Sequence, residues 1–264
     1  MEDTEMKHFD RLPAVPLLAN DPFFSIWMPA DLPTEAEASH WAGQQKPIRG
    51  TLCVDGVSKV FLGYSASDAA EITDVTITPT QTRYTAILNG VQLVANFWTP
   101  ALPDDPDTLS TPASFVDFEC VALDGKEHDV QVGLSVSTAI CYDGQQYKEV
   151  HTDVFPANGL NVCCAGQTNQ NILGQSGDHI TIDWGYFYLV SRERVSGDEF
   201  NVGMTWKADI GAAAQKAFAV LGYDQVADIN YFGVPCRAWY SRNGQTLLDA
   251  MLSFAVRHDD LLNA

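Results

Sequence analysis

Residues 83–98 read RYTAILNGVQLVANFW, and this stretch decides the class of fold. Runs of β-branched, aliphatic and aromatic residues flank the pair Asn89-Gly90. Asn and Gly tolerate the positive φ that a type I′ turn requires, so this pair is one of the strongest short-range signals for a hairpin. The stretch therefore predicts two antiparallel strands joined by a two-residue turn.

Two further turn signals of the same kind stand on either side of this hairpin. They are Asp55-Gly56, between residues 52–54 and 57–62, and Asp124-Gly125, between residues 115–123 and 129–137. Three hairpins in succession predict an antiparallel sandwich rather than a βαβ sheet. The remaining strand-like runs are residues 160–164, 179–190, 199–206 and 216–223, and the Pro/Asp-rich residues 103–107 predict an exposed crossing between hairpins.

The pattern changes after about Asp224. From Thr246 onward apolar residues recur at helical spacing, at Leu247, Leu248, Met251, Leu252, Phe254 and Ala255, and residues 259–262 continue that helix. We therefore expect a mainly β protein: a large antiparallel β-sandwich with a C-terminal α-helical extension. The expected organisation is a tail over residues 1–12, the sandwich over 13–224 and a helical linker over 225–264. The apolar stripe of the helix needs a neighbour, which could be the sandwich, a second copy of the chain or another domain.

Charge and composition narrow the class of function. The chain has 264 residues, with 15 basic and 34 acidic side chains and a net charge of −19. Such a chain repels a phosphate backbone and anionic lipid, so we expect no nucleic-acid partner and no membrane partner. No run approaches the ~20 apolar residues that span a bilayer. Residues 1–8 lack the features of a secretory signal, which predicts a cytoplasmic protein unless a leader has been removed.

The cysteine, histidine and acidic residues show no metal-binding spacing. None of the six cysteines forms a C-x-x-C pair, and most lie in apolar runs, which favours buried reduced thiols over a zinc site. The acidic residues 104, 105 and 107 are not followed by the Gly and Glu of an EF-hand loop. Walker and dinucleotide fingerprints are also absent. We therefore expect no metal and no cofactor.

Four ordered groups of motifs resemble the glutaminase A-like family. They are residues 13–27, PAVPLLANDPFFSIW; the short motifs HWAG at 40–43, PIRG at 47–50, VDG at 54–56 and FLG at 61–63; residues 174–189, GQSGDHITIDWGYFYL; and YD at 223–224, YFG at 231–233 and WYSRNG at 239–244. This resemblance implies a β-supersandwich N-terminal region. In full-length members that region precedes an all-α six-hairpin toroid similar to glycosidase catalytic domains.

The resemblance gives the expected function. The sequence stops at Ala264, where the toroid would begin, so we expect a non-catalytic accessory domain or truncated form of a glutaminase A-like hydrolase. The intact form would hydrolyse L-glutamine to glutamate and ammonia, and no catalytic residue is carried over. The expected partners are the downstream toroid, a small amide or sugar ligand, and a second copy bound through the C-terminal helix. The alternatives are a stand-alone carbohydrate-binding or glycosidase-associated sandwich module and a purely structural, oligomerising protein.

The first candidate ligand-binding residues lie in the motif at residues 174–189. Strand alternation would place Ile180, Ile182 and Trp184 on one face and Asp183 on the other, beside Thr181 and Phe187. A carboxylate beside an indole suits recognition of an amide or a sugar. The alternative is an Asp that holds a turn. Asp178 lies five residues before Asp183, so the two carboxylates would face opposite ways and would not form an acid/base pair.

The second candidate group comprises Asp21, Trp27, His40 and Trp41. Asp21 begins a turn, Trp27 closes an apolar strand, and His40 and Trp41 fall in a loop rich in Gly and Gln. In a binding site, Trp41 would stack on a ligand and His40 would donate a hydrogen bond to it. In the structural alternative, Trp27 and Trp41 fill the core and His40 holds the backbone of the loop.

Overall fold

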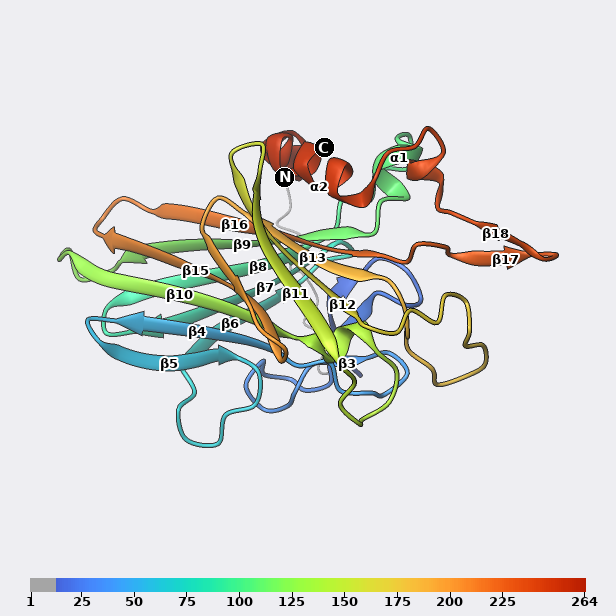
Figure 1. The fold of residues 1–264 in the computed structure, drawn as a ribbon. Helices are drawn as coiled ribbons and strands as arrows, with labels where there is room; N and C mark the ends of the chain where they lie inside the picture. The colour runs from blue at the N-terminus through green and yellow to red at the C-terminus, as the bar shows by residue number, and fades with distance from the viewer. Residues whose placement is uncertain (1–12) are drawn as a thin grey trace, which may run out of the picture.

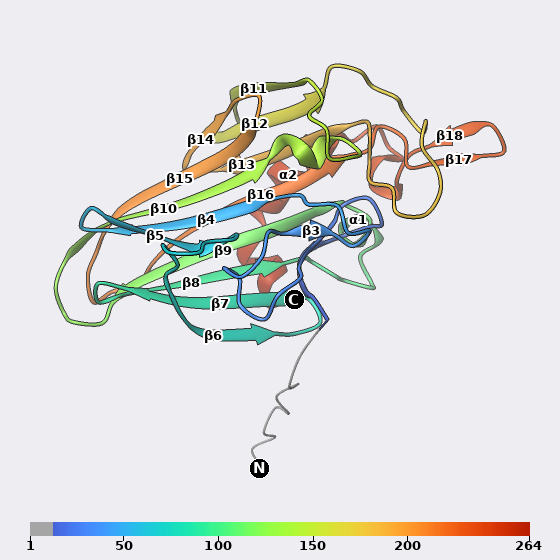
Figure 2. The same ribbon diagram turned by 90° about the horizontal axis from the view of Figure 1, so that it is seen from below.

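The computed structural model describes residues 13–264, and antiparallel sheets dominate it (Figures 1 and 2). A five-stranded sheet has the order β14-β15-β10-β4-β5, with β14 Arg194–Gly197, β15 Asn201–Ile210, β10 His128–Ser137, β4 Ile48–Val54 and β5 Val57–Leu62. An eight-stranded sheet has the order β11-β12-β13-β16-β9-β8-β7-β6, with β11 Val150–Ala157, β12 Leu160–Gln167, β13 Tyr186–Ser191, β16 Gln215–Asp224, β9 Ala113–Ala122, β8 Val91–Trp98, β7 Gln81–Leu88 and β6 Glu71–Ile77.

Smaller elements complete the fold. Strands β1 Val15–Ala19, β2 Ser25–Met28 and β3 Ser39–His40 form a three-stranded sheet, and β17 Ile229–Tyr231 and β18 Val234–Cys236 form a separate hairpin. The helices are α1 Pro106–Leu109, α2 Leu247–Val256 and α3 His258–Asn263, with 3₁₀ turns η1 Thr138–Cys141 and η2 Trp239–Ser241. None of these helices, within residues 13–264, is long and apolar enough to cross a membrane. The predicted mainly β fold with C-terminal helices is confirmed.

Two of the three predicted hairpins are confirmed. Asn89 and Gly90 take φ of 48° and 81° and join β7 to β8, with Leu88 opposite Val91. Asp55-Gly56 joins β4 to β5 in the same way, with φ of 51° and 82°. In both cases the local turn chemistry fixes the register of a whole strand pair.

The third predicted hairpin is wrong. Strands β9 and β10 do not pair: β9 lies between β8 and β16, whereas β10 lies between β15 and β4 in the other sheet. Asp124-Gly125 therefore carries the chain from one sheet to the other. The turn signal specifies only that the chain reverses direction. Which strand each flanking strand pairs with depends on packing, because long apolar strands must fill both inner faces of the sandwich.

The core lies between the two large sheets. Phe61 of β5 and Phe118 of β9 are both buried and meet edge to face across the interface, with ring centroids 6.3 Å apart. Gly50 in β4 lies against the Phe61 ring, and a Cβ at this position would fall 2.3 Å from it. The glycine therefore provides the space in which the aromatic pair packs.

Helix α2 covers the outer face of the eight-stranded sheet (Figure 1). Met251 and Phe254 are buried there, and the Phe254 ring stacks on Phe115 of β9 at 6.0 Å. The neighbour of the apolar stripe is thus the sandwich of the same chain. Of the residues that would form an interface between copies, Met251, Leu252 and Ala255 are buried and Leu248 is half-buried.

Residues 103–107 lie between β8 and β9 and are mostly exposed, as predicted, and Asp105 also caps a short helix beginning at Pro106. Two local expectations need correction. The terminal helix is not continuous: Arg257 leaves helical geometry at φ −93°, ψ 14°, and a second short helix begins at His258. Residues 179–185 are not a strand; β13 begins only at Tyr186, and the preceding segment is irregular.

Candidate functional site

Asp183, the central residue of the predicted site, is a buried anchor. Its Oδ1 accepts hydrogen bonds from Asp143 N at 3.0 Å, Gln167 Nε2 at 2.9 Å and Lys148 Nζ at 2.5 Å. Its Oδ2 accepts from Gln175 Nε2 at 3.3 Å. Burial alone would raise the pKa of Asp183, but these donors, Lys148 first, outweigh it and lower the pKa. The carboxylate is therefore ionised and fully engaged by the protein.

The anchor belongs to a network that joins three loops. Gln44 Oε1 accepts from Gly144 N at 2.8 Å, and its Nε2 donates to Asp143 Oδ1 at 2.6 Å. Asp143 Oδ1 also accepts from Thr181 N at 2.8 Å. Lys46 is buried and donates to the carbonyls of residues 139 and 142, and burial lowers its pKa to about 8. We call this network, with Asp183 at its centre, the loop clamp.

The strand pattern predicted around Asp183 does not hold. Thr181, Ile182, Asp183 and Trp184 are buried in succession, so this segment has no alternation of faces. An irregular backbone turns each side chain to a different partner, and the indole Nε1 of Trp184 donates to Gln225 O at 2.6 Å. The structural alternative, an Asp that holds a turn, describes the observed contacts of Asp183.

Asp21 and His40 stabilise a neighbouring turn. Asp21 Oδ1 accepts from Phe23 N, Phe24 N and Gln225 Nε2 at 2.7–3.0 Å, while burial raises the pKa of this carboxyl. His40 Nε2 donates to Pro22 O at 2.9 Å. Burial lowers the pKa of His40 to about 4, so the ring is neutral. His40 thus holds backbone, as the structural alternative proposed.

The tryptophans divide between core and surface. Trp184 is buried and meets Phe23 edge to face at 5.3 Å, and Trp27 is half-buried. Trp41 is 61% exposed, although its Nε1 donates to Pro22 O at 2.7 Å, so it does not fill the core.

Asp178 is exposed and stands apart from the clamp. The structure brings the other candidates to one end of the sandwich, and a ligand-binding role for any of them stays a prediction.

An apolar hairpin projects from the same end of the molecule (Figures 1 and 2). In β17 and β18 the exposed apolar side chains of Ile229, Tyr231 and Val234 share one face, and Phe232, in the turn, is 91% exposed. Nearby Trp239 is 56% exposed. The sequence reasoning missed this hairpin, because runs of three residues are too short to be recognised as a strand pair. We call these five residues the hairpin patch.

The base of this hairpin is fixed and strained. Val226 takes φ 60°, a conformation that β-branched residues rarely adopt. Its N–H donates to Asp224 Oδ1 at 2.8 Å, and its carbonyl accepts from Arg237 Nε at 2.9 Å. Asp228 accepts from Ala238 N at 2.6 Å. Backbone strain of this kind persists only where the surroundings hold it, so the fold sets the direction in which the hairpin points.

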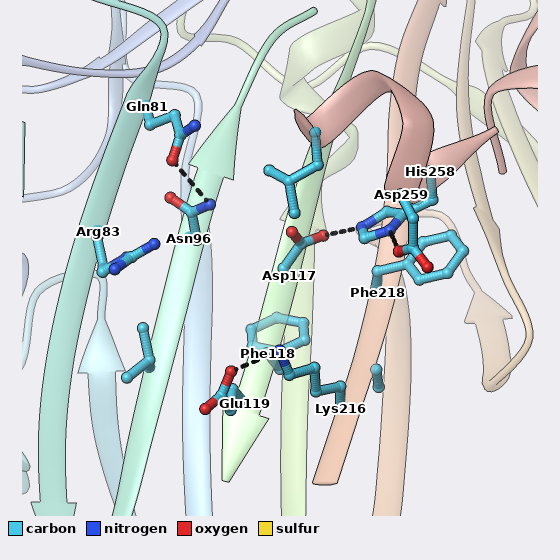
Figure 3. Close-up of a pocket in the computed structure, with 13 residues that line it drawn as sticks. Gln81, Arg83, Asn96, Asp117, Phe118, Glu119, Lys216, Phe218, His258 and Asp259 are labelled. Carbon is cyan, nitrogen blue, oxygen red and sulfur yellow. Dashed lines mark hydrogen bonds and ion pairs between the residues drawn. The ribbon is translucent and has the colours of Figure 1, made fainter. Parts of the chain in front are cut away.

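A polar groove of about 620 Å³ crosses the outer face of the eight-stranded sheet beside α3 (Figure 3). Arg83, Asn96, Asp117 and Phe218 are cross-strand partners on β7, β8, β9 and β16, and so form one row across it. His258 of α3 closes one end. Its ring stacks on Phe218 at 4.4 Å.

His258 ties α3 to the groove. Its Nε2 lies 2.8 Å from Asp117 Oδ1 and its Nδ1 lies 2.8 Å from Asp259 Oδ1. Burial lowers the pKa of His258, but the hydrogen bonds and charges of the two carboxylates prevail and raise it above its usual value. Sequence reasoning missed this groove because its residues come from four strands and a helix, and only the alternation of each strand could have indicated them.

Two protein-family models match the sequence. The model described as Domain of unknown function (DUF5127) matches residues 80–219, more than half of the chain, and the one described as Domain of unknown function (DUF4964) matches residues 1–74. The chain belongs to the DUF5127 family. The DUF5127 match begins at β7 and ends within β16, so it contains all the groove residues that come from the sheet.

One curated relative and one solved structure were also found to be similar to the chain. The chain is 27% identical over 136 residues to Glutaminase A of Aspergillus oryzae (strain ATCC 42149 / RIB 40), a match that covers 48% of this chain and 20% of that protein. With the family matches, this similarity confirms the predicted resemblance to the N-terminal region of glutaminase A-like proteins. The Slr1438 protein from Synechocystis sp. PCC 6803 aligns with a TM-score of 0.39 and 9% identity, over 85% of this chain and 100% of that chain.

Proposed function

We propose that this chain is a non-catalytic accessory domain of a glutaminase A-like hydrolase. In the intact protein it would buttress the six-hairpin toroid and place a loop at the rim of the active site, where L-glutamine would be hydrolysed to glutamate and ammonia. The single observation that carries the proposal is the hairpin patch, which exposes aromatic and aliphatic side chains on a projecting element. Exposed apolar clusters of this kind mark protein interaction sites.

The physical argument rests on the isolation of the hairpin. A two-stranded hairpin is marginally stable in water unless a third strand or a packed surface supports it. Within residues 13–264, β17 pairs with β18 alone, and one face and the turn of this hairpin are apolar and exposed. A hairpin held rigidly at its base and apolar at its tip is suited to insertion against a partner. The proposed partner is the toroid.

The loop clamp supports the non-catalytic part of the proposal. A general acid or base must reach the substrate, or a water next to it, through an unengaged atom. Asp183 instead shares its oxygens among four protein donors, and neutral His40 binds backbone on both sides of its ring, to Pro22 O and from Ala42 N. These residues hold the loops at the end from which the hairpin projects.

The test is release of ammonia from L-glutamine by the 264-residue chain alone, with a panel of aryl glycosides assayed alongside. We expect no turnover of either substrate class. Turnover that disappears in Asp183→Ala, in a variant whose near-UV circular dichroism matches that of the parent, would overturn the accessory role and place catalysis in the sandwich.

A further inference from the structure

The groove of Figure 3 presents hydrogen-bonding groups that the protein itself does not satisfy. Asn96 is 6% exposed, and its Oδ1 is buried without a hydrogen-bond partner within residues 13–264. Its Nδ2 makes one long contact, 3.4 Å to Gln81 Oε1. A buried amide oxygen without a donor is costly. Asn96 lines the groove, so a ligand donor would reach this oxygen only after a neighbouring side chain moves.

Arg83 supplies a donor without a protein partner. It lies directly opposite Asn96 on the neighbouring strand, its side chain is exposed, and no hydrogen bond or ion pair joins its guanidinium to a described residue. Side chains of directly opposite residues stand within reach of one another. A ligand that draws the mobile guanidinium aside can therefore contact Arg83 and the Asn96 amide together.

The opposite wall of the groove supplies acceptors that balance this donor. Glu119 Oε2 pairs with Lys216 Nζ at 2.9 Å, and Asp259 binds His258 through Oδ1 only. Counting these charged residues with Arg83 and Asp117, two permanent cations, Arg83 and Lys216, and the ring of His258, which is bonded to two carboxylates, face three acidic side chains. A groove with mixed charges of this kind disfavours a phosphate ion or a divalent cation. It favours a neutral ligand that both donates and accepts hydrogen bonds.

We propose that this groove binds a short neutral saccharide. A hydroxyl donates and accepts at one atom, so a row of hydroxyls can pair with Arg83, Asn96 and the acidic wall without burying a net charge. Arg83 and Asp117 stand two strands apart, roughly 10 Å, which accommodates more than one sugar ring. The volume lies within the range of about 300–1,000 Å³ for small-molecule sites.

The expected affinity is modest. The Phe218 ring is covered by His258, so no stacking of the sugar on that ring adds to the hydrogen bonds. We expect a dissociation constant on the order of 1 mM. This inference is independent of the accessory role, since the groove lies on the sheet face and the hairpin patch lies at the end of the sandwich.

The experiment is a titration of the 264-residue chain with maltose, cellobiose and, separately, L-glutamine, followed by ¹H–¹⁵N correlation spectra. We expect saturable shifts for at least one disaccharide in amides of β7, β8 and β9. Arg83→Met should weaken that binding about tenfold. The matched control is Arg194→Met, the same change at an exposed arginine on β14 of the other sheet, which should leave binding unchanged.

The outcomes separate the alternatives. Shifts confined to β7–β9 that weaken in Arg83→Met alone support the saccharide site. Binding of L-glutamine without binding of either disaccharide would overturn the ligand class. Equal weakening in both arginine variants, shifts outside the groove, or no shifts with any of the three probes at about 50 times the expected dissociation constant would overturn the site itself. Because Arg83 is exposed, both variants should fold, which identical spectra outside the groove would verify.

Discussion

Replacement of Asp183 by Asn tests whether the loop clamp stabilises the fold. Asn keeps Oδ1 as an acceptor but removes the charge. A hydrogen bond to a charged group contributes about 1.5–3 kcal/mol and a neutral one about 0.5–1.5 kcal/mol, so each of the three bonds on Oδ1 should lose about 1 kcal/mol. The Lys148 side chain is 36% exposed, so its share is reduced by solvent screening. The expected loss of unfolding free energy is about 2–3 kcal/mol.

The measurement is urea unfolding followed by fluorescence, with comparison of midpoints at an unchanged m-value. At about 2–4 °C per kcal/mol for a chain of this size, the thermal midpoint should fall by roughly 4–12 °C. Asp178→Asn is the matched control, because Asp178 lies in the same irregular segment but is exposed. Its effect should stay within about 0.5 kcal/mol.

The pH dependence gives a second check on the same variant. The folded pKa of Asp183 is lowered, so its stabilising effect is present above the unfolded pKa of about 3.9. This effect is lost as the pH falls through the folded pKa. The difference between the parent and Asp183→Asn should therefore be constant near neutrality and shrink below about pH 4. Equal stability of Asp183→Asn and Asp178→Asn at neutral pH would refute the clamp.

Three further predictions concern other parts of the molecule. Met251→Ala removes a fully buried side chain between α2 and the sheet, and it should lower the free energy of unfolding measured in urea by about 2–5 kcal/mol. A loss under about 1 kcal/mol would mean that α2 is not part of the cooperative unit. His128 has a raised pKa from hydrogen bonds to two carboxylates. The free energy of unfolding of the parent should therefore exceed that of His128→Asn by its full amount below about pH 6.5, and this difference should vanish as the pH rises through the folded pKa. A difference that grows with pH would contradict this assignment. Phe232→Ser should abolish co-purification with a co-expressed toroid domain of a glutaminase A-like protein, while Leu109→Ser, at an exposed apolar residue on α1, should not. Retention of the toroid by both variants would exclude the hairpin patch as the contact.

The sequence predicted those features of the fold that depend on local chemistry. Asn89-Gly90 set both the position and the register of a hairpin, because the left-handed turn conformation is a property of two residues. Asp124-Gly125 has the same chemistry, and yet its flanking strands belong to different sheets. The choice of strand partner depends on which faces are buried against one another, and a turn dipeptide carries no information about that.

The candidate residues show the same limit. Asp183 and His40 were recognised as unusual from their motifs, but whether a buried polar side chain serves a ligand or the backbone depends on donors that are remote in sequence. For Asp183 these include Gln167, 16 residues away, and Asp143, 40 residues away. Strand alternation gave the wrong geometry here because the segment is irregular. The same alternation, applied to Arg83 and Asn96, would have placed both on one polar face.

The hydrogen bonds of the clamp give the family motif at residues 174–189 a structural role. Asp183 and Trp184 make hydrogen bonds to two different segments. The carboxylate of Asp183 holds the loop around Asp143. The indole of Trp184 donates to the carbonyl of Gln225, at the start of the segment that leads to the hairpin. Gln225 in turn donates to Asp21 in the first motif. Two motifs of the resemblance, together with the residue that follows the motif at 223–224, therefore meet in one hydrogen-bonded unit. We expect a change in any of these residues to alter the direction of the hairpin, as the proposed accessory role requires.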